Sequence, residues 1–444
     1  LNPGSELTME VWVRVHDSNW NQKIFGKLNP SFNSGYMMAV DQGKCYPEVW
    51  MPAHYDDLQG FVPPLGYWYH FAVTVNAGDS MNVYVNGVFE GGQSIGGSSI
   101  AANNDNLIIG IAPWDLQNFQ YFGYIDEVRI WDNAKTRQEI FEGMHRHLSG
   151  SESGLLAYYN FNNANAPTSV PDESQNSNDC TFNNGSAANI MPSRAVIGDA
   201  TAETMNDLHG LWNGNGFVNP RVSVTDDGLS LLDTITDWDY VVFGHDGGSG
   251  TTMSDLPAAA PASMERTTRV WYMNEVGQTT PNFNMDLDNA SGGGTTLNTT
   301  FNAGDYYLLY RAGATGNFTI LRSADTKSAN TVVFENVDLE TGYYALAATQ
   351  DALAVTPGFQ NSALLNLWPN PGQGTFHLQV EATVAPGAEL QVFDVLGQRV
   401  HTQSFTEDIS FRTQMLDLQD QPAGTYFVHL KAGEQVFTRQ IQIQ

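Results

Sequence analysis

The stretch Leu7-Thr-Met-Glu-Val-Trp-Val-Arg-Val15 alternates apolar and polar residues with a period of two. Successive side chains of a β-strand point to opposite faces, so this pattern predicts a strand with one buried face. Similar runs follow at 70–75, 81–86 and 106–111. The pair Asn86-Gly87 predicts a two-residue hairpin, because a type I′ turn needs positive φ at both positions. The first part of the chain is therefore predicted to be built from short paired strands.

The composition extends this prediction to the whole chain. Its 444 residues include 42 Gly, 19 Pro, 10 Trp, 18 Tyr and 23 Phe, a mixture typical of many short strands joined by tight turns. Only residues 136–147 show a helical period, with Ile140, Phe141 and Met144 on one face. The length exceeds what one hydrophobic core serves, so two or three domains are expected.

The charge excludes some partners. A formal net charge of -29 opposes binding to nucleic acid or to an anionic membrane, since both require basic surface. No apolar run approaches the roughly 20 residues that span a bilayer. Acidic loops suit hard cations with oxygen ligands, so calcium is the one cofactor that we consider.

Four motifs in the first part recur together in a known family. They are Met9–Val13, Trp68–Thr74, Val83–Gly87 and Gly123–Trp131, followed by closing strands from Gly154. Their order and spacing resemble concanavalin-A-like, laminin-G-like jelly rolls, which implies such a domain over residues 1–193. The family usually has a further strand before the position of Leu7. We therefore expect the domain to lack its first strand and the chain to come from a longer precursor.

A second strand-rich segment covers residues 196–355, with runs such as Trp238–Phe243 and Asp305–Arg311 between Gly, Asn and Pro loops. The pattern predicts a second β-sandwich. It resembles modules of large surface proteins of Bacteroidetes, a resemblance that implies no function. Residues 356–365 are predicted to be a linker.

The last segment, residues 366–444, carries Leu367-Trp-Pro-Asn-Pro-Gly-Gln-Gly-Thr-Phe376, Leu390–Val400 and Pro422–Leu430. This set is similar to the C-terminal sorting domain of the type IX secretion system, a small Ig-like β-sandwich. The resemblance implies handling by that translocon, location at the cell surface or outside the cell, and cleavage near 355–365. The motif residues that we single out are Pro369, Asn370, Pro371, Gly397, Gly424 and Tyr426.

The sequence predicts no enzyme. Jelly-roll glucanases with retaining chemistry need two carboxylates about 5 to 5.5 Å apart on one strand face. Asp126 and Glu127 are adjacent, so we expect them to face opposite sides, with Arg129 as a partner of Glu127. His145 and His147 are spaced by two on the predicted helix, which opposes a shared metal.

Aromatic residues indicate a binding site instead. Glycan sites combine flat rings with polar groups on loops. The candidates for glycan contact are Tyr46, Trp50, His54, Tyr55, Trp114 and Trp20, and the candidate calcium ligands are Asp56, Asp57 and Asp115. The alternative is that these rings only cover the faces of the sandwich.

Two smaller features stay open. Cys45 and Cys180 are the only cysteines, and an exported protein could hold them either bridged or free. Ser80 and Thr234 lie in Asp-Ser-Met and Asp-Thr-Ile triplets that resemble the O-glycosylation acceptor pattern of Bacteroidetes.

These observations predict an all-β protein with a jelly roll, a second β-sandwich and a small C-terminal sandwich. The leading hypothesis is a secreted or surface adhesin that binds carbohydrate, with glycans or other surface proteins as partners. The alternatives are a structural subunit or spacer of an extracellular fibre or sheath, and an accessory part of a larger secreted enzyme.

Overall fold

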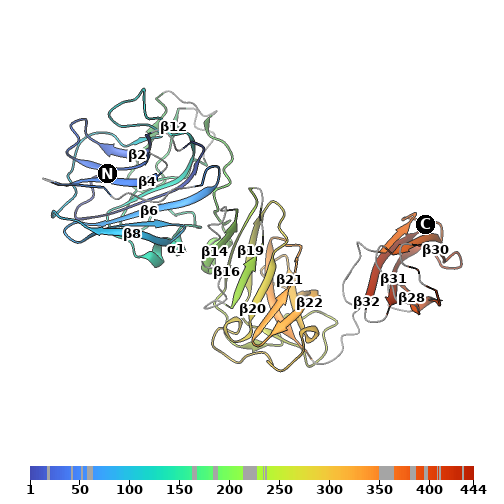
Figure 1. The fold of residues 1–444 in the computed structure, drawn as a ribbon. Helices are drawn as coiled ribbons and strands as arrows, with labels where there is room; N and C mark the ends of the chain where they lie inside the picture. Colours follow the sequence, from blue (N-terminus) through green and yellow to red (C-terminus); the bar gives the residue numbers. More distant parts are fainter. Residues whose placement is uncertain are drawn as a thin grey trace. The chain divides into compact units, whose positions relative to one another are not determined.

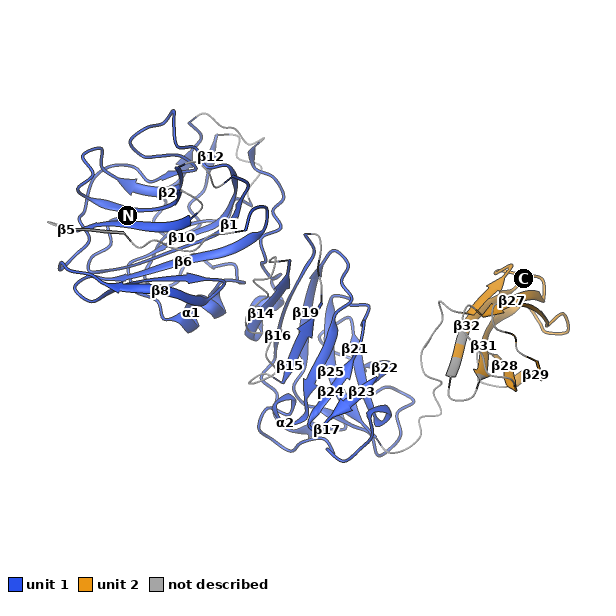
Figure 2. Cartoon of the chain, viewed as in Figure 1, with its two compact units in different colours: residues 1–351 blue, residues 352–444 orange. Residues whose placement is uncertain are grey.

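The computed structural model describes residues 1–17, 21–41, 44–51, 54–57, 64–162, 168–183, 189–213, 228–233, 235, 238–349, 365–380, 387–394, 399–407, 409, 412–432 and 435–444. At 54–57, 432, 435, 436 and 438 only the backbone is described. Strands dominate throughout, which confirms the predicted all-β class (Figure 1). The chain forms two compact units, residues 1–351 and 352–444 (Figure 2).

The first half of unit 1 is a sandwich of two antiparallel sheets, as the jelly-roll resemblance implies. The six-stranded sheet runs β11-β10-β1-β6-β7-β8 and comprises β1 (Glu6–Val15), β6 (Trp68–Asn76), β7 (Ser80–Val85), β8 (Val88–Ser94), β10 (Gly123–Trp131) and β11 (Leu155–Tyr159). The five-stranded sheet runs β5-β4-β3-β2-β9 and comprises β2 (Gln22–Leu28), β3 (Gly35–Asp41), β4 (Lys44–Met51), β5 (His54–Asp57) and β9 (Ile108–Ile109). A short pair, β12 (Ser169–Val170) and β13 (Cys180–Thr181), follows. Alternate residues of β1, β3, β6 and β7 fill the core between the two large sheets, as the alternation in Leu7–Val15 predicts.

A β-bulge in β10 corrects one prediction. The pairing of β1 with β10 shifts between Glu10 and Trp12, and Glu127 has a φ of 52°. Ile125 and Val128 both pack against the inner core, so the two residues between them lie on the outer face. Asp126 and Glu127 therefore share a face instead of pointing to opposite sides.

The predicted hairpin is confirmed, and the predicted helix exists but is shorter than expected: it ends at Gly143, so His145 and His147 lie beyond its end. Asn86 and Gly87 have φ values of 50° and 71°, as a type I′ turn between β7 and β8 requires. The helix α1 (Arg137–Gly143) begins at a capping box of Thr136 and Glu139. Its apolar face covers the outer side of β6 and β7, where Ile140 packs with Ala72 and Tyr84.

The second half of unit 1 is a separate sandwich with its own apolar core, as predicted. Its eight-stranded sheet contains β14 (Asn206–Trp212), β16 (Tyr240–His245), β17 (Thr251–Thr252), β18 (Glu265–Thr267), β19 (Trp271–Val276), β21 (Tyr306–Arg311), β22 (Thr319–Ser323) and β25 (Gly342–Ala348). Its four-stranded sheet contains β15 (Leu229–Leu232), β20 (Asn282–Asp286), β23 (Thr326–Ser328) and β24 (Thr331–Phe334). Short helical turns, η2 (Ala202–Thr204), α2 (Leu287–Ala290) and η3 (Ala303–Asp305), connect strands.

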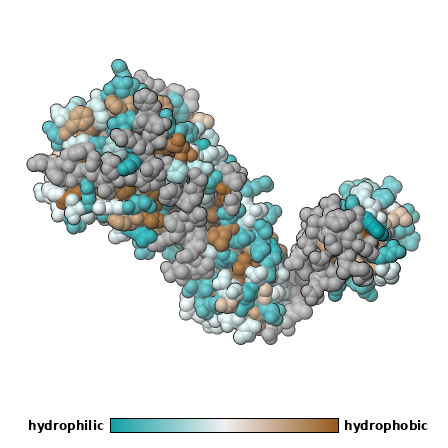
Figure 3. Space-filling model, viewed as in Figure 1, coloured by the Kyte–Doolittle hydropathy of each residue, from teal (hydrophilic) through white to brown (hydrophobic). Residues whose placement is uncertain are grey.

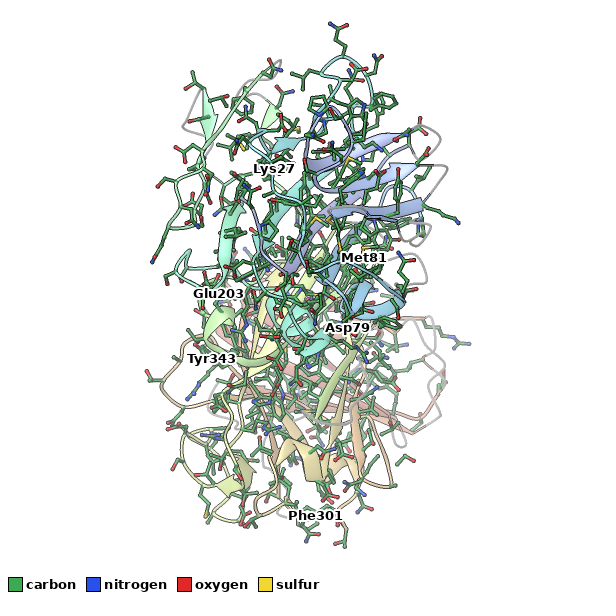
Figure 4. The ribbon with its side chains drawn as sticks, turned by 90° about the vertical axis from the view of Figure 1, so that its left-hand side faces the viewer. Lys27, Asp79, Met81, Glu203, Phe301 and Tyr343 are labelled. Carbon is green, nitrogen blue, oxygen red and sulfur yellow. The ribbon has the colours of Figure 1, made fainter. Side chains whose placement is uncertain are left out.

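An apolar junction joins the two sandwiches of unit 1. Trp12 and Trp68 from the jelly roll pack with Trp212 and Tyr240 from the second sandwich in one buried cluster. The Trp12 indole N–H donates to Met144 O at 2.7 Å, and the Trp212 indole N–H donates to Trp68 O at 3.1 Å. Figure 4 shows the same arrangement from the side, with Lys27 in the jelly roll, Glu203 near the junction and Phe301 at the far end of the second sandwich.

Charged groups of the jelly roll are buried beside this junction. The Arg129 guanidinium lies 2.7 Å from Glu127 Oε2, which also accepts from the Tyr158 hydroxyl at 2.7 Å. His70 Nε2 lies 3.3 Å from Glu10 Oε2. Burial raises the pKa of Asp126 to about 7, and the neighbouring Glu127 adds to the rise. The expected partnership of Arg129 with Glu127 is confirmed.

Unit 2 is a small sandwich around a third core. One sheet contains β26 (Leu365–Trp368), β27 (Thr375–Val380) and β30 (Thr413–Asp417). The other contains β28 (Ala388–Asp394), β29 (Arg399–Phe405), β31 (Gly424–Ala432) and β32 (Gln435–Ile443). The predicted linker at 356–365 lies outside the described residues except for Leu365, which begins β26.

His145 makes the stability of unit 1 depend on pH. It is fully buried between Trp12 and Trp212, its Nδ1 lies 2.7 Å from Val196 O, and burial lowers its pKa to about 3. The unfolded chain binds a proton there below about pH 6.5, whereas the folded chain binds it only near pH 3. The contribution of neutral His145 is therefore present above pH 6.5 and is lost as the pH falls toward 3.

We predict that His145→Gln reduces the pH dependence of the free energy of unfolding between pH 6.5 and 4, measured by urea titration of the full chain. His377→Gln, an exposed histidine of unit 2, serves as the control and should leave that dependence unchanged. An unchanged slope in His145→Gln would contradict the assignment.

Candidate functional site

The outer face of the five-stranded sheet is lined by large side chains. On β4, Cys45 and Val49 point into the core, whereas Tyr46 and Trp50 point outward. Met37 and Ala39 of β3 join them, and Trp114 packs on the same cluster. Three of the six candidates for glycan contact therefore lie in one cluster, and glycan contact itself stays a prediction.

A buried lysine lies at the centre of this aromatic face. Lys23 Nζ donates to the Tyr46 hydroxyl at 3.2 Å and lies 3.8 Å from Glu48 Oε1. The same ammonium lies 5.5 Å from the centroid of the Tyr46 ring and 5.6 Å from that of Trp114. Burial lowers the pKa of Lys23, and Glu48 acts in the opposite direction. The face therefore combines rings with a fixed cation and a carboxylate.

The exposed part of the face is a loop that carries Trp114. Its ring meets Phe32 edge-on at 4.8 Å between centroids and lies 6.1 Å from Phe119. Trp114 is half-buried and Phe32 is 47% exposed, whereas Tyr46 is only 6% exposed and Trp50 4%. Phe32 and Trp114 thus form the accessible layer above Tyr46 and Trp50.

Asp115 shapes this loop. Its Oδ1 accepts from the backbone N–H groups of Gln117 at 3.0 Å and Asn118 at 3.2 Å, and its Oδ2 accepts from the Asn118 amide at 2.9 Å. The Asn118 side chain, together with these backbone donors, lowers the pKa of Asp115. Both carboxylate oxygens therefore have protein partners that fold the loop beside Trp114.

The other candidates of this region are only partly described. The backbone of His54, Tyr55, Asp56 and Asp57 forms β5, where Tyr55 pairs with Trp50 and Asp56 with Val49, but their side chains lie outside the described residues. Trp20 also lies outside them. In the part of the chain that the structure describes, no three His, Cys, Asp or Glu side chains gather to hold a metal ion. Calcium at Asp56, Asp57 and Asp115 stays a prediction.

Sequence reasoning missed Lys23 and Phe32. Lys23 occurs in an apolar strand, Gln22–Leu28, and a register shift between Lys23 and Phe25 turns it to the outer face. A lysine inside an apolar strand was a usable signal, because Lys is rarely buried without a partner. Phe32 gave no signal, since its contact with Trp114 joins two loops.

The two cysteines are free, so the bridged alternative is wrong in this structure. Cys45 points into the core from β4, whereas Cys180 lies on the short strand β13 at the edge of that core. Ser80 begins β7 and its hydroxyl donates to Asp79 Oδ2 at 3.1 Å on the exposed hairpin. Asp79 is labelled in Figure 4. Thr234 lies outside the described residues, and O-glycosylation at either position stays a prediction.

In unit 2, the side chain of Asn370 hydrogen-bonds to the backbone along the edge of the last strand, β32. Its Nδ2 donates to Gln440 O at 2.9 Å, and its Oδ1 accepts from Gln442 N at 2.9 Å. Gly372 continues the pairing, since its N–H donates to Gln442 O at 2.9 Å. Pro369 and Pro371 flank Asn370 in the turn between β26 and β27.

The remaining motif residues of unit 2 have separate places. Gly424 begins β31, and the buried Tyr426 donates its hydroxyl to Pro422 O at 2.7 Å. Gly397 lies outside the described residues, between the paired strands β28 and β29.

Comparison with known families agrees with this geometry. The family described as secretion system C-terminal sorting domain matches residues 366–444. Residues 366–444 are a secretion sorting domain. The concanavalin A-like lectin/glucanases superfamily matches residues 1–141, and a domain family of unknown function matches residues 225–343.

Individual proteins are similar to smaller parts of this chain. Human pappalysin-1 is 31% identical over 167 residues, which cover 33% of this chain and 10% of pappalysin-1. A putative carbohydrate binding protein from Bacteroides ovatus is 20% identical with a TM-score of 0.33, over 41% of this chain and 52% of that one. Domain 4 of AbnA, an extracellular arabinanase from Geobacillus stearothermophilus solved with arabinotriose, is 21% identical with a TM-score of 0.25, over 32% and 67%.

The sorting domain assigns the location of the protein. Chains that carry it are exported by type IX secretion to the cell surface or the extracellular space. Within the described ranges, no helix is long and apolar enough to cross a membrane. The surface of the described residues carries apolar side chains as separate patches among hydrophilic ones in the view of Figure 3.

We predict that Asn370→Ala destabilises the sorting domain by about 1–2 kcal/mol, because two hydrogen bonds to β32 are lost. Hydrogen exchange at the Gln442 amide, measured by NMR, should become faster. Asn366→Ala, on β26 of the same domain, is the control for loss of an amide elsewhere. Unchanged exchange at Gln442 in Asn370→Ala would contradict this role of Asn370.

Proposed function

We propose that this exported protein binds carbohydrate at the outer face of the five-stranded sheet and catalyses no reaction. The observation that supports this most is the contact of Phe32, which is 47% exposed, with the half-buried Trp114 over the buried Lys23 and Tyr46. Sugar rings present C–H faces that pack on aromatic rings, and a few fixed polar groups orient their hydroxyls. Phe32 and Trp114 would contact the ligand, and the buried layer holds them in place.

The opposite face of the jelly roll supports the choice of this sheet. Its six-stranded sheet is covered by α1 and by the second sandwich through the cluster of Trp12 and Trp212. The carboxylates Asp126 and Glu127 are 5% and 1% exposed, and Glu127 is held by Arg129 and Tyr158. A substrate has no access to these two groups, which favours binding over hydrolysis.

We further propose that the protein uses this carbohydrate binding for adhesion. The proposed sugar-binding face lies on the five-stranded sheet, whereas the second sandwich packs on the six-stranded sheet, so an exported chain can attach to external glycans through this face. Calcium at the predicted carboxylates would be an accessory ligand, so binding should be compared with and without Ca²⁺.

We predict that Trp114→Ala raises the dissociation constant of the tightest ligand found on a glycan array by about tenfold or more, the equivalent of about 1.4 kcal/mol. The loss is expected because the accessible part of the Trp114 ring disappears while the strands remain. Trp368→Ala, which removes a tryptophan 40% exposed in the sorting domain, is the matched control and should keep full affinity.

Two results would contradict the proposal. One is an array with no binding by the wild-type chain, either in Ca²⁺ or in a chelator. The other is equal affinity of Trp114→Ala and the wild type for the same glycan.

A further inference from the structure

A second group of rings lies where the jelly roll meets the second sandwich. We call it the seam platform and define it by Arg14, His16, Tyr67, Tyr124 and Trp238. Arg14 and His16 lie at and just beyond the end of β1, and Tyr124 lies near the start of β10. Trp238 comes from the second sandwich, just before β16. The platform therefore needs both halves of unit 1.

The rings are arranged around the arginine. The Arg14 guanidinium carbon lies 3.5 Å from the centroid of Trp238 and 5.4 Å from that of Tyr124. Tyr67 lies 6.5 Å from Trp238, and His16 lies 5.1 Å from Tyr124 at a nearly perpendicular angle. These distances make one continuous aromatic surface with a cation in its middle.

This surface is accessible. Tyr124 and Trp238 are each 38% exposed, and the neighbouring Phe122 is 51% exposed. The buried junction nearby, by contrast, leaves Trp12 fully covered and Trp212 only 7% exposed. The exposed ring surface of the platform is therefore not used to join the two sandwiches.

Arg14 also differs from several other arginines, because it has no acidic partner among the described residues. Its Nε donates to Gly66 O at 2.9 Å, and no described carboxylate pairs with its guanidinium. Arg129, Arg266 and Arg322 each have an acidic partner. Because the chain carries a net charge of -29, an arginine without a carboxylate leaves a local positive site in an acidic protein.

We propose that the seam platform binds a sugar that carries a carboxylate, such as a hexuronic or sialic acid unit. The two terminal nitrogens of Arg14 would pair with the carboxylate, a geometry that guanidinium groups favour. The exposed faces of Tyr124 and Trp238 would receive the sugar ring. This site is separate from the one at Phe32 and Trp114 and does not depend on it.

The competing explanation is that Arg14 only fastens Trp238 to the jelly roll. Cation–π contacts of this kind stabilise structures without any ligand. The two explanations differ in what they predict for binding, because a fastening role alone gives no preference for a charged ligand.

The test is calorimetric titration of the full chain at low salt with trigalacturonic acid and with sialyllactose, each beside its methyl ester. The ester keeps the ring faces and removes the charge. We expect at least one acid to bind about tenfold more tightly than its ester. Arg14→Gln should abolish that preference, and Tyr124→Ala should weaken acid and ester together.

Two controls make the test specific. Arg322→Gln removes a half-buried arginine that is paired with Asp325, and it should keep the preference for the acid. Trp114→Ala should also keep it, because Trp114 belongs to the other site. The proposal is overturned if neither acid binds, if Arg14→Gln retains the preference, or if Trp114→Ala removes it.

Discussion

The packing of Trp12 against Trp212 is the contact on which the arrangement of unit 1 depends. The two rings meet edge-on at 5.6 Å between centroids, and each indole N–H donates to a backbone carbonyl across or beside the junction. The contact covers a face of the jelly roll that holds Glu10, His70 and Arg129. Charged groups are rarely buried unless they are paired. The second sandwich can therefore cover this face only because these charged groups pair with one another.

This constraint decides which surfaces remain for ligands. With the six-stranded sheet covered, the five-stranded sheet keeps its outer aromatic face, and the seam gains a platform that neither sandwich forms alone. The sorting domain forms a separate compact unit with its own core. Export is therefore assigned to unit 2, and the binding surfaces that we propose lie in unit 1.

Much of this fold could be predicted from local pattern. Features that depend on residues close in sequence were found: the alternation in β1, the Asn86-Gly87 turn and the motif around Asn370. The bulge at Glu127 could not be predicted, because a positive φ in a glutamate has no sequence signature. The contact of Arg14 with Trp238 joins distant parts of the chain, so only the packed structure reveals it.

Differential scanning calorimetry of the full chain tests most directly whether the two sandwiches of unit 1 unfold together. We expect two transitions, one for residues 1–351 and one for residues 352–444. Three separate transitions would show that the jelly roll and the second sandwich are independent. That result would contradict the conclusion that the packing of Trp12 against Trp212 holds the two sandwiches together as one unit.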